Sequence, residues 1–166
     1  RATTEIPIVM APSGDPVGTG LISSLSRPGG NVTGLSAATA ELAGKSLELI
    51  REILPGARRV AALADPANAF TKSFLTQIHA SAKATGLEIQ DVMLGATQDL
   101  EPIFAAMASG GVDALIVQPT LLRTSIIALA RKHRLGTVSC YRAFADAGGL
   151  MSYAGGLADR YRTAPP

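Results

Sequence analysis

Seven side chains in this sequence could together hold a small charged molecule. They follow short apolar runs and supply a carboxylate, two amides, a hydroxyl, a phenol, a guanidinium and a phenyl ring: Asp15, Asn68, Gln118, Thr120, Tyr141, Arg142 and Phe70. A carboxylate forms charge-assisted hydrogen bonds with an ammonium group, and a guanidinium binds a carboxylate through two parallel bonds. The set predicts a ligand with one carboxylate, one ammonium group and an apolar or aromatic body.

Three of these side chains have a structural interpretation that competes with ligand binding. Asp15 precedes Pro16, where its carboxylate would cap a helix. Asn68 lies in an Asp-Pro-Ala-Asn turn and would cap the helix that follows. Phe70 begins a stripe of apolar residues spaced four apart, which is typical of a helix face packed on a core. Both interpretations stay open for each residue.

The four remaining side chains form two pairs further along the chain. Gln118 and Thr120 flank Pro119, and Thr120 would cap a helix or present its hydroxyl and the first helix amides to a carboxylate. Tyr141 would stack on an aromatic or apolar ligand, and Arg142 would bind a carboxylate. Packing at the surface or at a hinge is the alternative for Tyr141 and Arg142.

Motifs for catalysis, metals and cofactors are weak in this sequence. His79 and His133 lie far apart without ligand-spaced Cys, Asp or Glu beside them, which argues against a metal site. The glycines in 18–20 suggest a dinucleotide-binding turn, but the third glycine of that motif is replaced by Ser23. Cys140 ends an apolar run and is expected to be a buried apolar side chain rather than a nucleophile. We therefore expect no cofactor, no metal and no enzymatic activity.

The composition bounds the class of protein. Hydrophobic residues make up 47% and charged residues 17% of the 166 residues, as in one globular domain. The net charge is only +2, the basic residues are scattered and Trp is absent, so a nucleic-acid interface is not expected. One cysteine excludes an internal disulfide, and no apolar run reaches the roughly 18–20 residues of a membrane span.

The elements that must position the seven side chains alternate along the chain. Apolar runs predict strands at 6–11, 59–64, 87–94, 114–117 and 137–140, with a short extended segment at 31–36. Helical spacing and capping residues predict helices from Pro16 to Arg27 and at 39–54, 70–86, 99–107 and 121–133. Such alternation predicts an α/β fold, a three-layer, Rossmann-like parallel sheet flanked by helices. Ligands bind beyond the carboxyl ends of such strands, at the loops 12–16, 65–70, 118–121 and 140–144.

Four segments carry a resemblance to a known family. They are Gly-Asp-Pro-Val at 14–17, Leu-Ser-Arg-Pro-Gly-Gly-Asn-Val-Thr-Gly-Leu-Ser at 25–36, Asp-Pro-Ala-Asn at 65–68 and Ala-Gly-Gly-Leu-Met-Ser-Tyr at 147–153. The chain, over about 6–162, resembles the substrate-binding proteins of ABC importers, the family that includes binders of tryptophan and other aromatic amino acids. The resemblance implies a periplasmic-binding-protein-like type I fold of two lobes. Residues 1–35 and 148–166 would then be remnants of the first lobe with the hinge crossings, residues 36–147 the second lobe, and the chain a fragment.

The resemblance also implies a function. The protein would capture a small ligand, such as an amino acid or a related carboxylate, between its lobes and deliver it to an ABC permease and ATPase. Its location would be the periplasm, or the cell envelope as a lipoprotein. A ligand-sensing effector or receptor domain of the same fold is the alternative, and an enzyme on a doubly wound sheet is a third for which no residue set is found.

The first-lobe remnants are expected to be the least settled part of the chain. The strand at 6–11 would have lost its partner strands, and an unpaired buried strand invites pairing with another chain. We therefore expect either mobility of residues 6–35 or a homodimer formed by swapping them.

Overall fold

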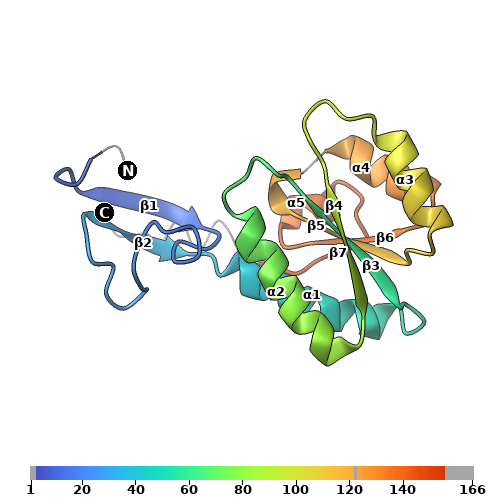
Figure 1. Ribbon diagram of the computed structural model, residues 1–166, viewed down its shortest axis with the longest axis horizontal. Coiled ribbons are helices and arrows are strands. Elements are labelled where there is room, and N and C mark those ends of the chain that lie inside the picture. Colours follow the sequence, from blue (N-terminus) through green and yellow to red (C-terminus); the bar gives the residue numbers. More distant parts are fainter. Residues whose placement is uncertain (1–2, 122, 156–166) are drawn as a thin grey trace.

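The computed structural model describes residues 3–121 and 123–155, which form two parallel β-sheets (Figure 1). The smaller sheet pairs β1 with β2, at Ile8–Ser13 and Val32–Ser36. The larger sheet has the strand order β4-β3-β5-β6-β7. Its strands, in chain order, are Arg59–Ala64, Glu88–Met93, Ala114–Val117, Gly136–Ser139 and Met151–Ser152. The two strands of the smaller sheet extend from the body that the larger sheet forms.

Helices cover both faces of the larger sheet. They are α1 Thr39–Ile53, α2 Thr71–Thr85, α3 Leu100–Ser109, α4 Thr124–Lys132 and α5 Arg142–Asp146, with the 3₁₀ turn η1 at Pro119–Leu121. Along β3, Val60 and Ala62 pack toward α1 and α2, while Ala61 and Leu63 pack toward α3 and α4. This alternation follows from the two-residue period of a strand, and it confirms the three-layer α/β fold.

Some predicted elements have the expected bounds, whereas other bounds differ. The strands at 59–64 and 114–117 have the predicted bounds, because both are apolar runs covered on two faces. The helix predicted at 121–133 begins later, at Thr124, and Leu121 instead ends η1. Pro119 and its successors close a tight turn, with the Leu121 amide donating to the Gln118 carbonyl. Asp99 caps α3 as predicted, its carboxylate accepting from the Glu101 amide.

The helix predicted from Pro16 to Arg27 is wrong. The segment forms consecutive turns, in which the Leu21 and Ile22 amides donate to the Pro16 carbonyl and Gly20 takes a φ of +72°. Of its apolar side chains Ile22 is buried, whereas Val17, Leu21 and Leu25 are exposed. A short helix without a surface to pack against is marginal, and the local pattern alone did not form one.

The prediction of a buried, partnerless strand at 6–11 also needs correction. Strand β1 pairs in parallel with β2, and Val9 is 51% exposed. The two strands approach closely at Gly34, where a side chain would place Cβ 2.9 Å from the Met10 amide nitrogen. This contact explains the last glycine of the Arg-Pro-Gly-Gly-Asn-Val-Thr-Gly motif. Strand β1 is exposed because no helix layer covers it among the described residues.

The division into two lobes stays a prediction for the whole protein. Within the described residues, β7 continues the larger sheet by pairing with β6, after the chain leaves α5. Residues 156–166, which belong to the predicted first-lobe remnant, lie outside the described residues. None of the described helices is long and apolar enough to cross a membrane.

Candidate ligand-binding site

A pocket of about 140 Å³ lies at the carboxyl ends of β5 and β6. We call it the carboxyl-edge pocket, and it is lined by Gly14, Ala37, Thr39, Leu42, Pro119, Cys140, Tyr141, Arg142, Ala154 and Gly155. Besides the residues that follow β5 and β6, three further segments contribute: the turn after β1, the start of α1 beyond β2, and the residues after β7. The position matches the rule that open parallel sheets bind ligands beyond the carboxyl ends of their strands.

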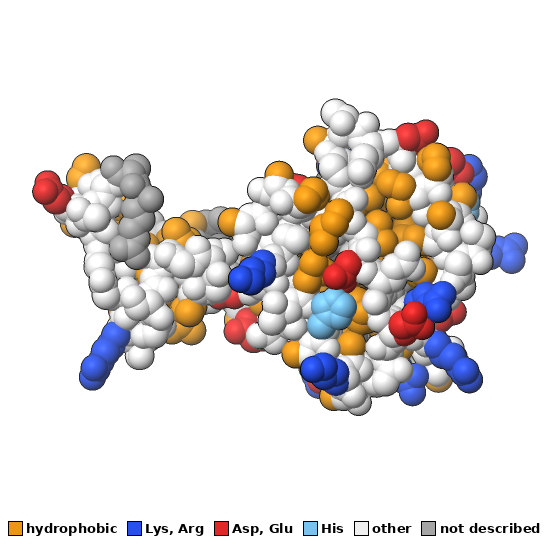
Figure 2. Space-filling model, viewed as in Figure 1, with side chains coloured by type: hydrophobic (Ala, Val, Ile, Leu, Met, Phe, Trp, Pro, Cys, Tyr) orange, Lys and Arg blue, Asp and Glu red, His pale blue; other side chains and the backbone are white. Residues whose placement is uncertain are grey.

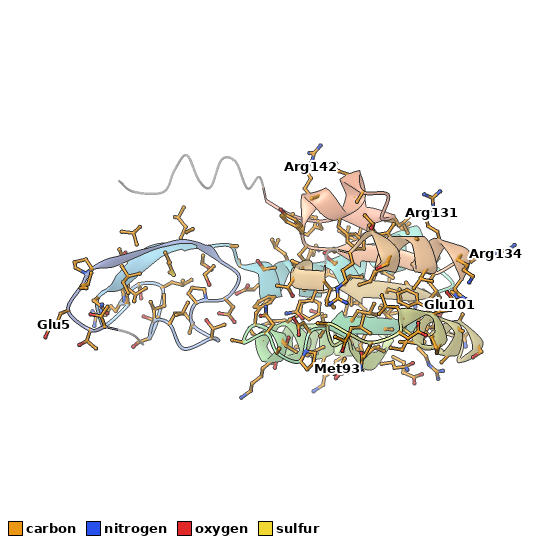
Figure 3. The ribbon with its side chains drawn as sticks, turned by 90° about the horizontal axis from the view of Figure 1, so that it is seen from above. Glu5, Met93, Glu101, Arg131, Arg134 and Arg142 are labelled. Atoms are coloured by element: carbon orange, nitrogen blue, oxygen red, sulfur yellow. The ribbon has the colours of Figure 1, made fainter. Side chains whose placement is uncertain are left out.

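Tyr141 and Arg142 reach this pocket because β6 passes directly into α5. Tyr141 has an extended backbone, with a φ of −138°, and is the residue before the first turn of α5. The Arg142 side chain is 85% exposed, and its Nε lies 3.7 Å from Asp146 Oδ2 one helical turn away. Figure 3 shows Arg142 projecting away from the sheet. Such a surface ion pair contributes little, so the guanidinium can be redirected to another carboxylate at low cost.

Gln118 is fully buried at the end of β5, where the oxygen of its side-chain amide is hydrogen-bonded and the nitrogen, within the described part of the chain, is not. Its Oε1 accepts from the Asp65 amide at 2.8 Å and from the Thr71 hydroxyl at 3.1 Å. A backbone amide can only donate, so this bond fixes which end of the Gln118 amide is the oxygen. Nε2 is buried with no hydrogen-bond partner among the described residues, a state that costs about 1–3 kcal/mol.

Asn68 and Phe70 lie just before α2 and contact its first residues. Asn68 Oδ1 accepts from the Phe70 amide at 2.8 Å, and the Asn68 carbonyl accepts from the Thr71 amide. Phe70 packs on Phe74, with ring centroids 6.0 Å apart. Its ring also lies against Gly14, where a side-chain Cβ would be 3.2 Å from Phe70 Cε2. Phe70 therefore joins the core to the segment that follows β1.

The Asp15 carboxylate contacts α2 through a residue that the sequence did not single out. Oδ1 accepts from the Gly18 amide at 2.8 Å, and Oδ2 accepts from the hydroxyl of Ser73 in the first turn of α2. The packing is close, because a Cβ at Gly18 would lie 2.8 Å from Asp15 Cγ. The predicted capping of a helix by Asp15 is thus replaced by a turn bond and a contact with α2.

The predicted residues divide into groups. Asp15, Asn68, Phe70 and Gln118 surround the N-terminus of α2, directly or through Ser73 and Thr71. Tyr141 and Arg142 line the carboxyl-edge pocket. Thr120 lies exposed in η1, and no hydrogen bond joins it to either group. Sequence reasoning did not name Thr71 and Ser73, but the Thr-Lys-Ser sequence that opens α2 could have indicated them. Hydroxyl side chains at a helix start often form hydrogen bonds with nearby polar groups.

Cys140 lines the pocket as a protonated thiol. Burial raises its pKa to about 11, and only the Ser46 hydroxyl, 3.8 Å from Sγ, opposes that rise. A thiol is nucleophilic only as the thiolate, so Cys140 is unreactive near neutral pH. Among residues 3–121 and 123–155, no three His, Cys, Asp or Glu side chains gather where they could hold a metal ion.

The parallel sheet covered on both faces has the periplasmic-binding-protein type I architecture. The chain belongs to the family of ABC transporter substrate binding proteins, whose model matches residues 1–155.

Named relatives agree with this family. The tyrosine-binding protein of Clostridioides difficile (strain R20291) is 29% identical over 132 residues, which are 80% of this chain and 37% of that protein. The structure of an ABC domain in complex with L-Trp from Streptococcus pneumonia is 27% identical with a TM-score of 0.83, covering 95% of this chain and 55% of that one. A conserved domain protein from Vibrio cholerae is 25% identical with a TM-score of 0.84, covering 95% and 54%. The chain thus spans about half the length of the two solved structures.

Proposed function

We propose that this chain is part of the solute-binding component of an ABC importer, which captures an amino acid or a related carboxylate between two lobes and catalyses no reaction. The observation that carries the proposal is the carboxyl-edge pocket, which is lined both by the strand ends of the larger sheet and by segments leading from β1 and β2. The tyrosine and tryptophan named for two relatives support an aromatic amino acid as the ligand class.

The side chains at this edge suit the two charges of an amino acid. Arg142 would bind the ligand carboxylate and Tyr141 would stack on its apolar or aromatic body. The buried Nε2 of Gln118 is a donor that a ligand oxygen would satisfy. Asp15 would bind the ammonium group, in competition with the Ser73 hydroxyl that it accepts from here.

Capture would follow from a shift in population. If Asp15 belongs to one lobe and Arg142 to the other, a ligand that bridges them binds the closed arrangement more tightly than the open one. Closure then signals occupancy to a permease driven by an ATPase. We place this event in the periplasm, or at the cell envelope if the protein is a lipoprotein.

The test is calorimetry of the full-length protein with each standard amino acid. At least one should bind, and Arg142→Ala and Tyr141→Ala should each weaken it by about tenfold, ~1.4 kcal/mol. Arg27→Ala removes an exposed cation elsewhere and should leave affinity unchanged. Binding of a sugar or nucleoside, and of no amino acid, would contradict the charge assignment and leave the family intact.

We further propose that β1 mediates pairing between two copies of this chain when the rest of a first lobe is absent. Within residues 3–121 and 123–155, β1 is paired along one edge, and Ile6, Ile8 and Val9 are exposed beside it. An exposed apolar edge strand is a template for a second strand.

A further inference from the structure

A groove runs along the amino ends of β5 and β6, at the edge of the sheet opposite the carboxyl-edge pocket. It consists of two adjoining depressions of about 560 and 630 Å³ that share Leu54, Arg134 and Leu135. We call it the amino-edge groove, and its lining also includes Ile53, Arg131 and Leu150. It lies at the end of the molecule opposite β1 and β2 (Figure 3).

The floor of the groove is apolar and exposed. Leu54 and Leu150 meet over Gly136, where a Cβ would lie 3.0 Å from Leu54 Cδ1 and 3.2 Å from Leu150 Cδ2. Leu150 is 52% exposed and Ile53 is 47% exposed. Large apolar side chains that are exposed together, next to a recess, are typical of a surface that a partner covers.

The rim of the groove carries an excess of positive charge, from Arg131 and Arg134. Figure 2 shows several Lys and Arg side chains toward this end of the body, with Asp and Glu side chains among them. Among the described residues, Arg131 and Arg134 make no ion pair. The Arg131 side chain lies beside Gly148, with Nη1 3.7 Å from the position that a Cβ would take there.

Of the residues that the structure describes, Asp113 is the one acid that lines the two depressions, and it stays ionised while accepting from the Arg58 and Arg59 backbone amides. Glu101 pairs with Lys132. Two arginines thus face one carboxylate in the lining.

Arg134 also has a backbone conformation that is unfavourable for a residue with a side chain. Its φ is +59°, the left-handed region that glycine adopts freely and that follows many helices. An arginine there keeps its guanidinium at the rim at a cost to stability. Strain of this kind is a ground for seeking a function at the residue.

We propose that the amino-edge groove docks a segment of a partner protein in which carboxylates flank an aliphatic side chain. The aliphatic side chain would cover Leu54 and Leu150, and the carboxylates would pair with Arg131 and Arg134. Charge complementarity favours an acidic partner, and the recessed apolar floor favours a peptide over the flat headgroup surface of a membrane. This proposal does not depend on which ligand the carboxyl-edge pocket holds.

The experiment measures binding of a fluorescent peptide of alternating Asp and Leu to the full-length protein. The peptide should bind, and replacing its Asp by Asn or its Leu by Ser should abolish binding. The double variant Arg131→Ala/Arg134→Ala should weaken binding by about tenfold or more. The matched variant Arg27→Ala/Lys72→Ala removes the same charge from other exposed positions and should bind as the parent does. Equal weakening by both double variants would reduce the effect to net charge and overturn the proposal.

A second variant and a second probe separate docking from structure. Arg134→Gly should weaken binding of the peptide. It should also raise the midpoint of thermal unfolding, because glycine adopts the φ of this position freely. Loss of binding in this variant therefore cannot be attributed to misfolding. Vesicles of anionic lipid should show no binding that the double variant Arg131→Ala/Arg134→Ala removes. If they do, and the peptide does not, the groove is a membrane contact and the proposal is wrong.

Discussion

Gln118 Oε1 accepts a hydrogen bond from the Thr71 hydroxyl at 3.1 Å, and this bond joins the end of β5 to the first residue of α2. The same oxygen accepts from the Asp65 amide, at the end of β3. One side chain thus holds two strand ends and a helix start in register at the edge where the ligand is proposed to bind.

Replacing Gln118 should therefore destabilise the fold. Gln118→Ala leaves the Asp65 amide without its acceptor and empties a fully buried position. Although Nε2, which has no partner among the described residues, is removed as well, the net effect should lower the free energy of unfolding by about 1–3 kcal/mol. Thr120→Ala, two residues on and exposed, should change it by less than about 0.5 kcal/mol. Urea unfolding followed by circular dichroism measures both. Equal, small effects would mean that the buried amide is dispensable for the fold.

The contact between Asp15 and Ser73 gives a second prediction. Ser73→Ala removes one donor and should cost about 0.5–1.5 kcal/mol. Gly18→Ala should cost at least as much, because the new Cβ would press on the Asp15 carboxylate. Gly56→Ala is the matched control, since nothing lies within 4 Å of a Cβ there. Thermal unfolding of the three variants should show Gly56→Ala as the mildest, and any other order contradicts the contact.

The lowered pKa of Asp113 predicts that the stability of the fold falls in acid. Hydrogen bonds from the Arg59 and Arg58 amides lower the pKa of this carboxyl below its usual value. A carboxyl whose pKa is lower in the folded state stabilises the fold above the unfolded-state pKa of about 3.9, and that contribution is lost as the pH falls through the lower folded-state pKa. Asp113→Asn should therefore show a flatter decline in stability over this acid range. Parallel curves of unfolding free energy against pH for the two proteins would count against it.

The exposed edge of β1 predicts association of this chain. Light scattering of residues 1–166 should detect a dimer, and Val9→Lys should shift it toward the monomer because a charged edge strand resists pairing. Met93→Lys, a matched change on the edge strand of the larger sheet, should leave the dimer intact. A strict monomer in the parent chain, with slow hydrogen exchange throughout β1, would contradict pairing through this edge.

The sequence by itself determined the layers of the larger sheet. Residues 59–64 and 114–117 are continuous apolar runs that only a strand covered on both faces can satisfy, and the helices between them carry one apolar face each. Hence the α/β fold, the parallel direction and the edge of the sheet near which the candidate side chains lie could all be predicted. The seven candidate residues were found for the same reason, because each follows a strand or begins a helix.

Only the tertiary structure decided which of those residues touch, and what the segment after Pro16 becomes. Asp15 and Ser73 are 58 residues apart, and no local pattern links them; their contact depends on where the segment after β1 crosses α2. Val17, Leu21 and Leu25 have helical spacing, yet no helix forms because nothing among the described residues covers that face. Periodicity records which face of a segment could be buried, whereas a stable element also requires a second surface to bury it against.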